Sequence, residues 1–398
     1  LGLTLHKGDL FTVQRSELTR LRDTNGDDLA DEYLTHAKGW GVTGNYHEYA
    51  YGPAVDGAGN LWVALNCSIG KGSNPNNQWR GWSLAVKPDG TWSPVSGGFR
   101  SPSGIGTNLA GDVFATDQQG NWFPTCPLMH LKRGTFHGHA DALQFTKLPG
   151  ATFEVKQPLP KDLTVAEAAM RIPAYQLPAV WFPYRKMGMS TTDILADSTK
   201  GKFGPFAGQL FCGEFTMSFV SRVFLEKVDG KYQGACFRFR EGLDCAALRL
   251  QWGTDGSMYI GQSNRGWNSL GTKSYGLQSL QWTRKVPFEI KEMSAHPAGF
   301  RLTFTQSVDA ATLINPKSYT VTSYTYPYQS KYGGEPIDLK THTVKVDELD
   351  TTWQSVQLTL DEMRPGYVYE LQASGIRNSQ NQPLLHSAAY YTLNRVPE

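Results

Sequence analysis

Gly8-Asp9-Leu10-Phe11 is the first of five copies of one short pattern, in which a glycine and a polar residue precede an aliphatic and an aromatic residue. The other copies are Gly59-Asn60-Leu61-Trp62, Gly111-Asp112-Val113-Phe114, Gly208-Gln209-Leu210-Phe211 and Gly256-Ser257-Met258-Tyr259. Successive glycines lie 51, 52, 97 and 48 positions apart. Because the interval of 97 is close to twice the others, we expect a degenerate sixth copy near residues 150–165.

This repeat predicts an all-β fold. The glycine permits a tight hairpin turn, and the aliphatic and aromatic residues after it point to opposite faces of a strand. Units of about 50 residues that contain only strands are typical of β-propeller blades. The composition, with 41 glycines, 12% aromatic residues and only 19% charged residues, agrees with many short strands and turns. We therefore expect a six-bladed β-propeller over residues 1–286.

A different pattern follows the last copy of the repeat. Segments 299–304, 356–360 and 366–371 alternate apolar and polar residues with period two, and turn residues separate them. This pattern predicts an immunoglobulin-like β-sandwich over residues 287–398, with the domain boundary near Val286-Pro287.

Charge and hydropathy exclude two classes of partner. The net charge is +2, and no cluster of Lys and Arg is interleaved with aromatic residues as a nucleic-acid groove requires. No stretch approaches the roughly 18 uncharged apolar residues of a membrane span. The first residue is Leu1 and not a Met followed by a signal peptide, as expected of a processed or excised piece. We expect a secreted or periplasmic protein.

The cysteines leave two alternatives open. The five residues show neither C-x-x-C spacing nor a C-x-x-C-H haem site, which removes the common zinc and c-type haem interpretations. Cys236 and Cys245 are the favoured local pair for a disulfide, and free thiols are the alternative.

A histidine cluster suggests a transition-metal site. His137 and His139 lie two residues apart, which places them on one face of a strand, and His130 precedes them. Asp141 is the one nearby carboxylate. The alternative is that these residues are ordinary hydrogen-bonding histidines in loops.

An acidic stretch near the N-terminus has the spacing of a calcium loop. Asp23, Asn25, Asp27 and Asp31 place oxygen atoms at positions 1, 3, 5 and 9, with the backbone carbonyl near Leu29 as a further ligand. Hard cations prefer such oxygen ligands, so the sequence predicts a structural Ca²⁺ site; a solvated acidic turn is the alternative.

Three segments together resemble a known family. They are Tyr46-His47-Glu48-Tyr49, Arg100-Ser101-Pro102-Ser103-Gly104-Ile105-Gly106 and the stretch from Asp112 to Gly120. In these segments the chain resembles the soluble quinoprotein glucose and aldose sugar dehydrogenases, which are six-bladed propellers that use pyrroloquinoline quinone (PQQ) and calcium. The resemblance covers about residues 1–285 and rests on motifs only.

The resemblance implies a set of functional residues. His47 corresponds to the general base. In that family, further cationic residues bind the quinone. The corresponding positions of this sequence hold Ala246 and Leu248, so Lys186 or Arg265 would have to supply the positive charge instead. The implied cofactor-binding residues are Arg100, Ser101, Gly120, Asn121, Lys186 and Arg265, and the candidate substrate-binding residues are Asp117, Gln118, Trp122 and Trp267.

Three functions remain open on these observations. The leading hypothesis is a sugar or polyol oxidoreductase with calcium, PQQ and a fused or separate electron acceptor. The second is a non-catalytic carbohydrate-binding or interaction propeller of a larger extracellular protein, because tryptophans in loops can stack on sugar rings. The third is a polysaccharide lyase or hydrolase on the same scaffold, which fold alone does not exclude.

Overall fold

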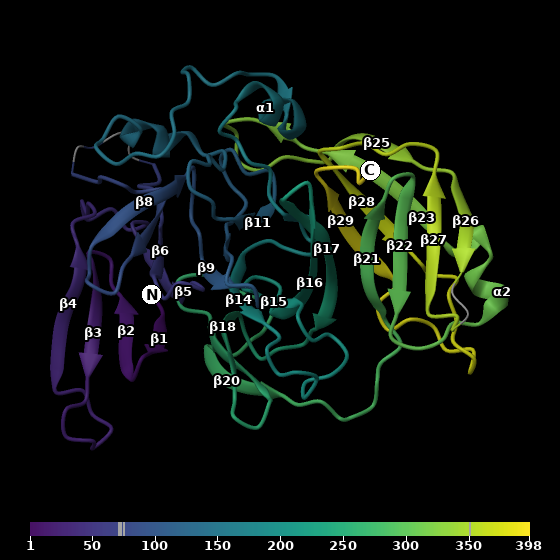
Figure 1. Ribbon diagram of the computed structural model, residues 1–398, viewed down its shortest axis with the longest axis horizontal. Helices are drawn as coiled ribbons and strands as arrows, with labels where there is room; N and C mark the ends of the chain where they lie inside the picture. Colours follow the sequence, from purple (N-terminus) through teal and green to yellow (C-terminus); the bar gives the residue numbers. More distant parts are fainter. Residues whose placement is uncertain (71–73, 75, 350–351) are drawn as a thin grey trace.

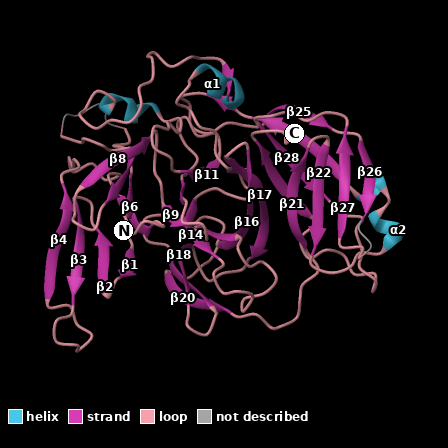
Figure 2. Cartoon of the chain, viewed as in Figure 1, coloured by secondary structure: helices cyan, strands magenta, loops and turns pink. Residues whose placement is uncertain are grey.

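The computed structural model describes residues 1–398 except 71–73, 75 and 350–351. Strands dominate the described residues, and their α-helices are limited to α1 (Val165–Arg171) and α2 (Ala310–Leu313) (Figure 2). The prediction of an all-β protein is therefore confirmed. Within the described part of the chain, none of the helices is both long enough and apolar enough to cross a membrane.

The first two thirds of the chain form successive antiparallel sheets (Figure 1). The first sheet contains β1 (Leu3–His6), β2 (Asp9–Val13), β3 (Glu17–Arg22) and β4 (Glu32–Lys38). The second contains β5 (Ala50–Val55), β6 (Leu61–Leu65), β7 (Trp82–Val86) and β8 (Trp92–Gly97). The third contains β9 (Gly104–Thr107), β10 (Val113–Thr116), β11 (Cys126–His130) and β13 (Val180–Phe182). The fourth contains β14 (Thr191–Ala196), β15 (Leu210–Glu214), β16 (Phe219–Val228) and β17 (Lys231–Arg240). The fifth contains β18 (Ala247–Trp252), β19 (Met258–Ser263) and β20 (Tyr275–Leu280).

The repeated glycine has the same place in every one of these sheets. It lies in the turn between the first and second strands, with φ between 82° and 87° at the five positions, a region that residues with a side chain rarely adopt. In four of the five copies the strand after it buries the aliphatic residue, as at Leu61, which is 2% exposed, whereas Leu10 in the first copy is 38% exposed. The local part of the sequence prediction is thus confirmed.

The sheets pack on one another in sequence order as propeller blades do. The first strand of each sheet contacts the preceding sheet: β5 lies against β1 and β2, β9 against β5, β14 against β9, and β18 against β14 and β15. This arrangement gathers the first strands at the centre and directs the later strands outward.

The prediction of a sixth unit near residues 150–165 is wrong. Residues 150–165, all of which the structure describes, contain only the two-residue strand β12 (Leu163–Thr164) and the first residue of α1. Pro158 and Pro160 lack the backbone N–H that a ladder of hydrogen bonds needs, so this stretch cannot supply an inner strand. The long interval is instead filled by an insertion between β11 and β13, which also carries the 3-10 helix η1 (Ala140–Phe145).

The outward faces of the first and fifth sheets carry exposed apolar side chains. Leu3 and Leu5 on β1 are 62% and 69% exposed, and Tyr275 and Leu277 on β20 are 78% and 71% exposed. The same sheets bury their opposite faces against their neighbours. The first and fifth sheets therefore do not bury these side chains against each other.

The rest of the chain forms two facing sheets around a second hydrophobic core, with residues of both contributing to that core. One sheet contains β21 (Ile290–His296), β22 (Gly299–Phe304), β27 (Ser355–Leu360) and β26 (Val344–Leu349). The other contains β29 (Ala388–Leu393), β28 (Tyr367–Gln372), β23 (Thr320–Thr325) and β25 (Ile337–Thr341); β24 (Pro327–Tyr328) pairs with β12, and the 3-10 helix η2 spans Pro316–Ser318.

This second sheet is continuous with the fourth sheet of the first region. β17 pairs with β29 through Gly234 with Thr392, Ala235 with Tyr391, and Cys236 with Tyr390, which produces one eight-stranded sheet. The predicted boundary near residue 286 falls in the connection between β20 and β21. The two-domain division and the immunoglobulin-like class of the second region stay predictions.

All five cysteines are buried free thiols. The favoured Cys236–Cys245 disulfide is therefore absent and the free-thiol alternative holds. The Cys236 thiol instead points to the backbone carbonyl of Trp181, with Sγ 3.7 Å from the oxygen.

Candidate functional site

The predicted site residues come from loops at one end of the blade-like sheets. Strands alternate in direction, so the loop from the fourth strand of one sheet to the next sheet lies at the same end as loops that join second and third strands. His47 lies in the β4–β5 loop, Arg100 in the β8–β9 loop, Asp117 in the β10–β11 loop and Trp267 in the β19–β20 loop. The topology alone therefore brings these segments to a common end.

Asp117 fixes the loop that carries Arg100. Its buried carboxylate accepts hydrogen bonds from the backbone N–H groups of Arg100 and Ser101, both at 2.8 Å, and of Gln118 at 2.7 Å. Burial raises the pKa of Asp117 to about 6, although these bonds oppose the shift. The carboxylate is 0% exposed and lies below the surface that a substrate would reach.

The Arg100 side chain is enclosed by two residues. It is 9% exposed, it packs on Gly120, and its guanidinium lies 5.2 Å from the centre of the Tyr332 ring. A β-carbon on Gly120 would overlap the Arg100 side chain, so a larger residue here would displace that side chain. The Nε atom of Arg100 is buried and has no hydrogen-bond partner among the described residues.

His47 is exposed and lies within the electrostatic influence of Arg100. Partial desolvation, and secondly the charge of Arg100, lower the pKa of His47 below its usual value. Its ring meets Tyr46 edge to face at 5.4 Å, and its backbone N–H donates to Asn45 Oδ1 at 2.9 Å. The structure thus presents to solvent an imidazole whose pKa is lowered, within the electrostatic field of a buried cation.

A segment from the second region covers part of this end. We call residues 327–334 the C-terminal arm. The backbone N–H of Trp122 donates to Gln329 O at 3.0 Å, and Asn121 Nδ2 donates to Ser330 O at 2.8 Å. Gly333 N–H donates to Gly120 O at 3.0 Å. Asn121 and Trp122 therefore hold the arm in place, and Tyr332 is carried to Arg100.

Sequence reasoning missed the arm. Tyr324, Tyr326 and Tyr328 alternate with period two, and all three are buried, which marks a segment packed on another part of the protein. The pattern does not reveal which part, because the contacts join residues about two hundred positions apart.

The cationic residues predicted to bind the quinone, Lys186 and Arg265, do not lie together. Lys186 forms an ion pair with Glu370 on β28 at 2.6 Å. Arg265 precedes Gly266, which lies against the Tyr46 hydroxyl, so its loop shares the end of the molecule that carries His47. Trp267 in the same loop is 68% exposed.

Arg249 is a cation that the sequence analysis did not assign. It lies on β18, and its Nη1 donates to the backbone carbonyl of Ser103 at 3.3 Å. Its guanidinium lies 5.3 Å from the centre of the Tyr51 ring. Arg249 therefore supports the loop of Arg100 from the centre of the sheets. Ser101 in that loop accepts a hydrogen bond from Asn66 Nδ2 at 2.9 Å.

The predicted calcium loop lies between β3 and β4, at the opposite end from His47. Asp23 accepts backbone hydrogen bonds from Gly26 at 2.7 Å and Asp28 at 2.9 Å, and Asp27 accepts one from Leu29 at 2.9 Å. These bonds fold the loop around its own carboxylates. Calcium binding by Asp23, Asn25, Asp27, Leu29 and Asp31 stays a prediction.

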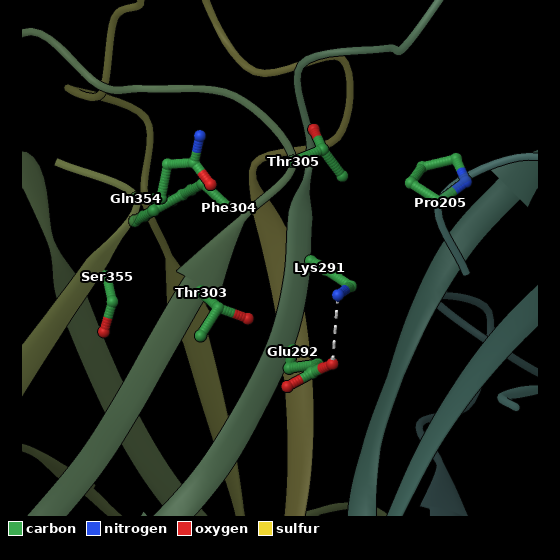
Figure 3. Close-up of a pocket in the computed structure, with 8 residues that line it drawn as sticks. All are labelled: Pro205, Lys291, Glu292, Thr303, Phe304, Thr305, Gln354 and Ser355. Carbon is green, nitrogen blue, oxygen red and sulfur yellow. Dashed lines mark ion pairs between the residues drawn. The ribbon is translucent and has the colours of Figure 1, made fainter. Parts of the chain in front are cut away.

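A hollow of about 310 Å³ lies elsewhere, between the two regions (Figure 3). Pro205 faces Lys291 and Glu292 across it, and the last two form an ion pair at 3.7 Å. None of the predicted site residues lines this hollow.

Comparison with known proteins yields structural likeness only. No protein-family model matches the sequence, and no curated protein does. Solved structures that resemble the chain include a glucose dehydrogenase, with 15% identity and a TM-score of 0.45 over 71% of this chain and 76% of that one. The apo-form soluble aldose sugar dehydrogenase from Escherichia coli has 14% identity and a TM-score of 0.42 over 70% and 77%. The PQQ-bound aldose sugar dehydrogenase from Streptomyces coelicolor has 16% identity and a TM-score of 0.42 over 69% and 74%. At these values the likeness assigns neither an activity nor a ligand to this chain.

Proposed function

We propose that this chain is a sugar or polyol oxidoreductase of the quinoprotein dehydrogenase type. The observation that carries the proposal is that His47, an exposed imidazole with a lowered pKa, lies at the same end of the sheets as the enclosed guanidinium of Arg100. Oxidation of an alcohol requires a base for the hydroxyl proton and an environment that tolerates negative charge on the acceptor, and these two residues supply both.

His47 is suited to the role of base because its lowered pKa keeps the ring unprotonated at neutral pH. It can therefore take the hydroxyl proton as hydride leaves the same carbon. Tyr46 and Trp267, which are 64% and 68% exposed, give that end of the protein aromatic surfaces for a sugar ring. Gln118 lies in the adjacent β10–β11 loop and is the polar group we assign to hydroxyl recognition.

The residues fit an anionic quinone through Arg100 and Arg249, but not through Lys186. Arg100 has a buried Nε without a partner, and Arg249 supports the same loop. Lys186 is already paired with Glu370, so we assign the remaining cationic role to Arg265. When bound, PQQ would supply the hydride acceptor. Gly120 would shape this site by keeping Arg100 in place.

Three further features belong to the same proposal. Calcium would stabilise the loop from Asp23 to Asp31 and, by the family resemblance, assist the quinone near Gly120 and Asn121. The enzyme would pass electrons to a fused or separate acceptor. It would act in the periplasm or outside the cell.

The test is reconstitution of the purified chain with Ca²⁺ and PQQ, followed by the cofactor spectrum during addition of a sugar panel. We expect His47→Ala to abolish reduction and leave cofactor affinity nearly unchanged, because a base acts mainly in the transition state. Arg100→Ala should weaken cofactor affinity. Lys186→Ala is the matched control and should change neither quantity.

One observation favours a second candidate, a carbohydrate-binding module without a cofactor. Tyr332 of the C-terminal arm lies over Arg100, where it takes up part of the guanidinium surface. In that case PQQ will not bind, and Trp267→Ala will weaken sugar binding measured by calorimetry. Sugar-dependent reduction of bound PQQ would reject this candidate.

A further inference from the structure

Three potential metal ligands meet beside the Arg100 loop. Cys67, His139 and Asp141 have ligand atoms that all lie within 4.8 Å of one another. The cysteine follows β6 in the second sheet, and in the long insertion His139 caps η1 and Asp141 lies in its first turn. About seventy residues separate the two parts of the cluster in the sequence, so its formation depends on the fold.

We propose that Cys67, His139 and Asp141 bind a divalent transition metal ion of the Zn²⁺ class. This inference does not depend on the oxidoreductase proposal, since it uses none of the residues assigned there to the base or the quinone. It also differs from the predicted calcium loop in position and in ligand type.

The backbone holds the ligands before any metal binds. Cys67 N–H donates to Arg100 O at 2.9 Å, and His139 N–H donates to Gly98 O at 3.0 Å. Cys67 and His139 are 1% and 4% exposed, whereas Asp141 is exposed. Two ligands are therefore fixed, and the third can rotate through the short distance needed to close on an ion.

The hydrogen bonding of the ligands leaves them able to bind a metal. His139 Nδ1 accepts only a long contact from Asp141 N–H, at 3.4 Å. The Cys67 Sγ and a carboxylate oxygen of Asp141 lie within 4.8 Å of each other. An ion would replace the thiol proton, which is released to solvent, and would be coordinated by thiolate, imidazole and carboxylate.

Ligand chemistry determines the class of metal. A soft sulfur with a nitrogen and one oxygen suits Zn²⁺ or Co²⁺, and it does not suit Ca²⁺ or Mg²⁺, which require several oxygen ligands. Three protein ligands with one side open leave the fourth position to water. The exposed side of Asp141 provides that opening.

The nearby charges permit a cation. The Arg100 guanidinium acts on all three ligands and opposes a metal ion. The buried carboxyl of Asp117, in the neighbouring β10–β11 loop, accepts a hydrogen bond from the Arg100 backbone N–H and offsets this charge when it is ionised. A divalent ion with the Cys67 thiolate and the Asp141 carboxylate is itself neutral overall, so the added burial of charge is small.

The structure also revises the histidine cluster suggested by the sequence. Among the described residues, His130, His137 and His139 do not form a common ligand group. His130 Nε2 instead lies 3.9 Å from Asp112, and the His137 ring packs on Phe99. Of the three, only His139 enters the proposed site, together with the carboxylate of Asp141.

The experiment is titration of the EDTA-treated protein with Co²⁺ and Zn²⁺. We expect one Co²⁺ per chain with a thiolate-to-cobalt charge-transfer band in the near ultraviolet, displacement by Zn²⁺, and no displacement by excess Ca²⁺. Loss of a metal ligand reduces metal affinity at least as much as loss of a residue that hydrogen-bonds to a ligand. Cys67→Ser should therefore abolish the charge-transfer band, and Asp141→Asn should raise the Kd for the metal by at least about tenfold.

Cys245→Ser is the matched control, because it removes another buried thiol outside the cluster and should leave the titration unchanged. Asp141→Asn alters an exposed side chain and keeps the test valid if Cys67→Ser fails to fold. A Co²⁺ complex without the charge-transfer band, or Zn²⁺ affinity unchanged in Asp141→Asn, would overturn the proposal.

Discussion

Replacement of Gly120 by alanine tests the enclosure of Arg100. The added β-carbon would overlap Cδ, Nε and Cζ of Arg100, so the guanidinium and the carbon that carries it would both have to move. Tyr332 closes the other side at 5.2 Å from the guanidinium. Overpacking of this kind costs about 1–3 kcal/mol, while the change from glycine to alanine recovers about 0.4–1 kcal/mol from the unfolded chain. We expect a net loss of roughly 0.5–2 kcal/mol in the free energy of unfolding.

The assay is urea denaturation of wild type and variant, compared by midpoint at equal slope. Gly57→Ala is the control, because a β-carbon there would be no closer than 3.8 Å to its neighbours and should be neutral or slightly stabilising. Combining Gly120→Ala with Tyr332→Ala should recover part of the loss by making room for Arg100. A Gly120→Ala protein as stable as wild type would refute the enclosure.

Three further predictions follow from burial and pairing. Leu5→Ser and Leu277→Ser should change the free energy of unfolding by no more than about 0.5 kcal/mol and reduce binding of a hydrophobic dye, since both residues are exposed; a larger loss would show that they are packed. Burial lowers the pKa of His130 to about 4 from 6.5. The contribution of the neutral ring to stability is therefore full above pH 6.5 and is lost as pH falls toward 4, with a slope of at most about 1.4 kcal/mol per pH unit. His130→Gln should flatten this part of the plot of unfolding free energy against pH, and an unchanged plot would contradict the lowered pKa of His130. Residues 1–286 expressed alone should aggregate, because the edge of β17 and buried Phe237 would be uncovered; a soluble, cooperatively unfolding fragment would show that the first region is independent.

Local features were predictable from the sequence and long-range ones were not. The repeated glycines mark the same hairpin in each sheet because glycine adopts the left-handed turn conformation far more readily than residues with a side chain. The content of the 97-residue interval could not be predicted, because spacing shows where hairpins occur and not what lies between them. An insertion with α1 and η1 has the same length as a missing sheet.

The candidate site shows the same limit. His47 and Arg100 could be placed near each other because they precede the first strands of adjacent sheets. The position of Lys186 could not be predicted, since its ion pair with Glu370 depends on the second region folding onto the first. Cys67 carried no signal, because a single cysteine acquires ligand partners only through tertiary contacts.

The pairing of β17 with β29 limits how the molecule can move. Rotation of the second region relative to the first would break backbone hydrogen bonds in the middle of a sheet, which is costlier than sliding two surfaces past each other. The C-terminal arm starts from this rigid frame and ends on Gly120. Tyr332 therefore cannot be withdrawn from Arg100 by a hinge between the regions, and a ligand that needs the guanidinium must displace the arm locally, at a rate set by the arm's own opening.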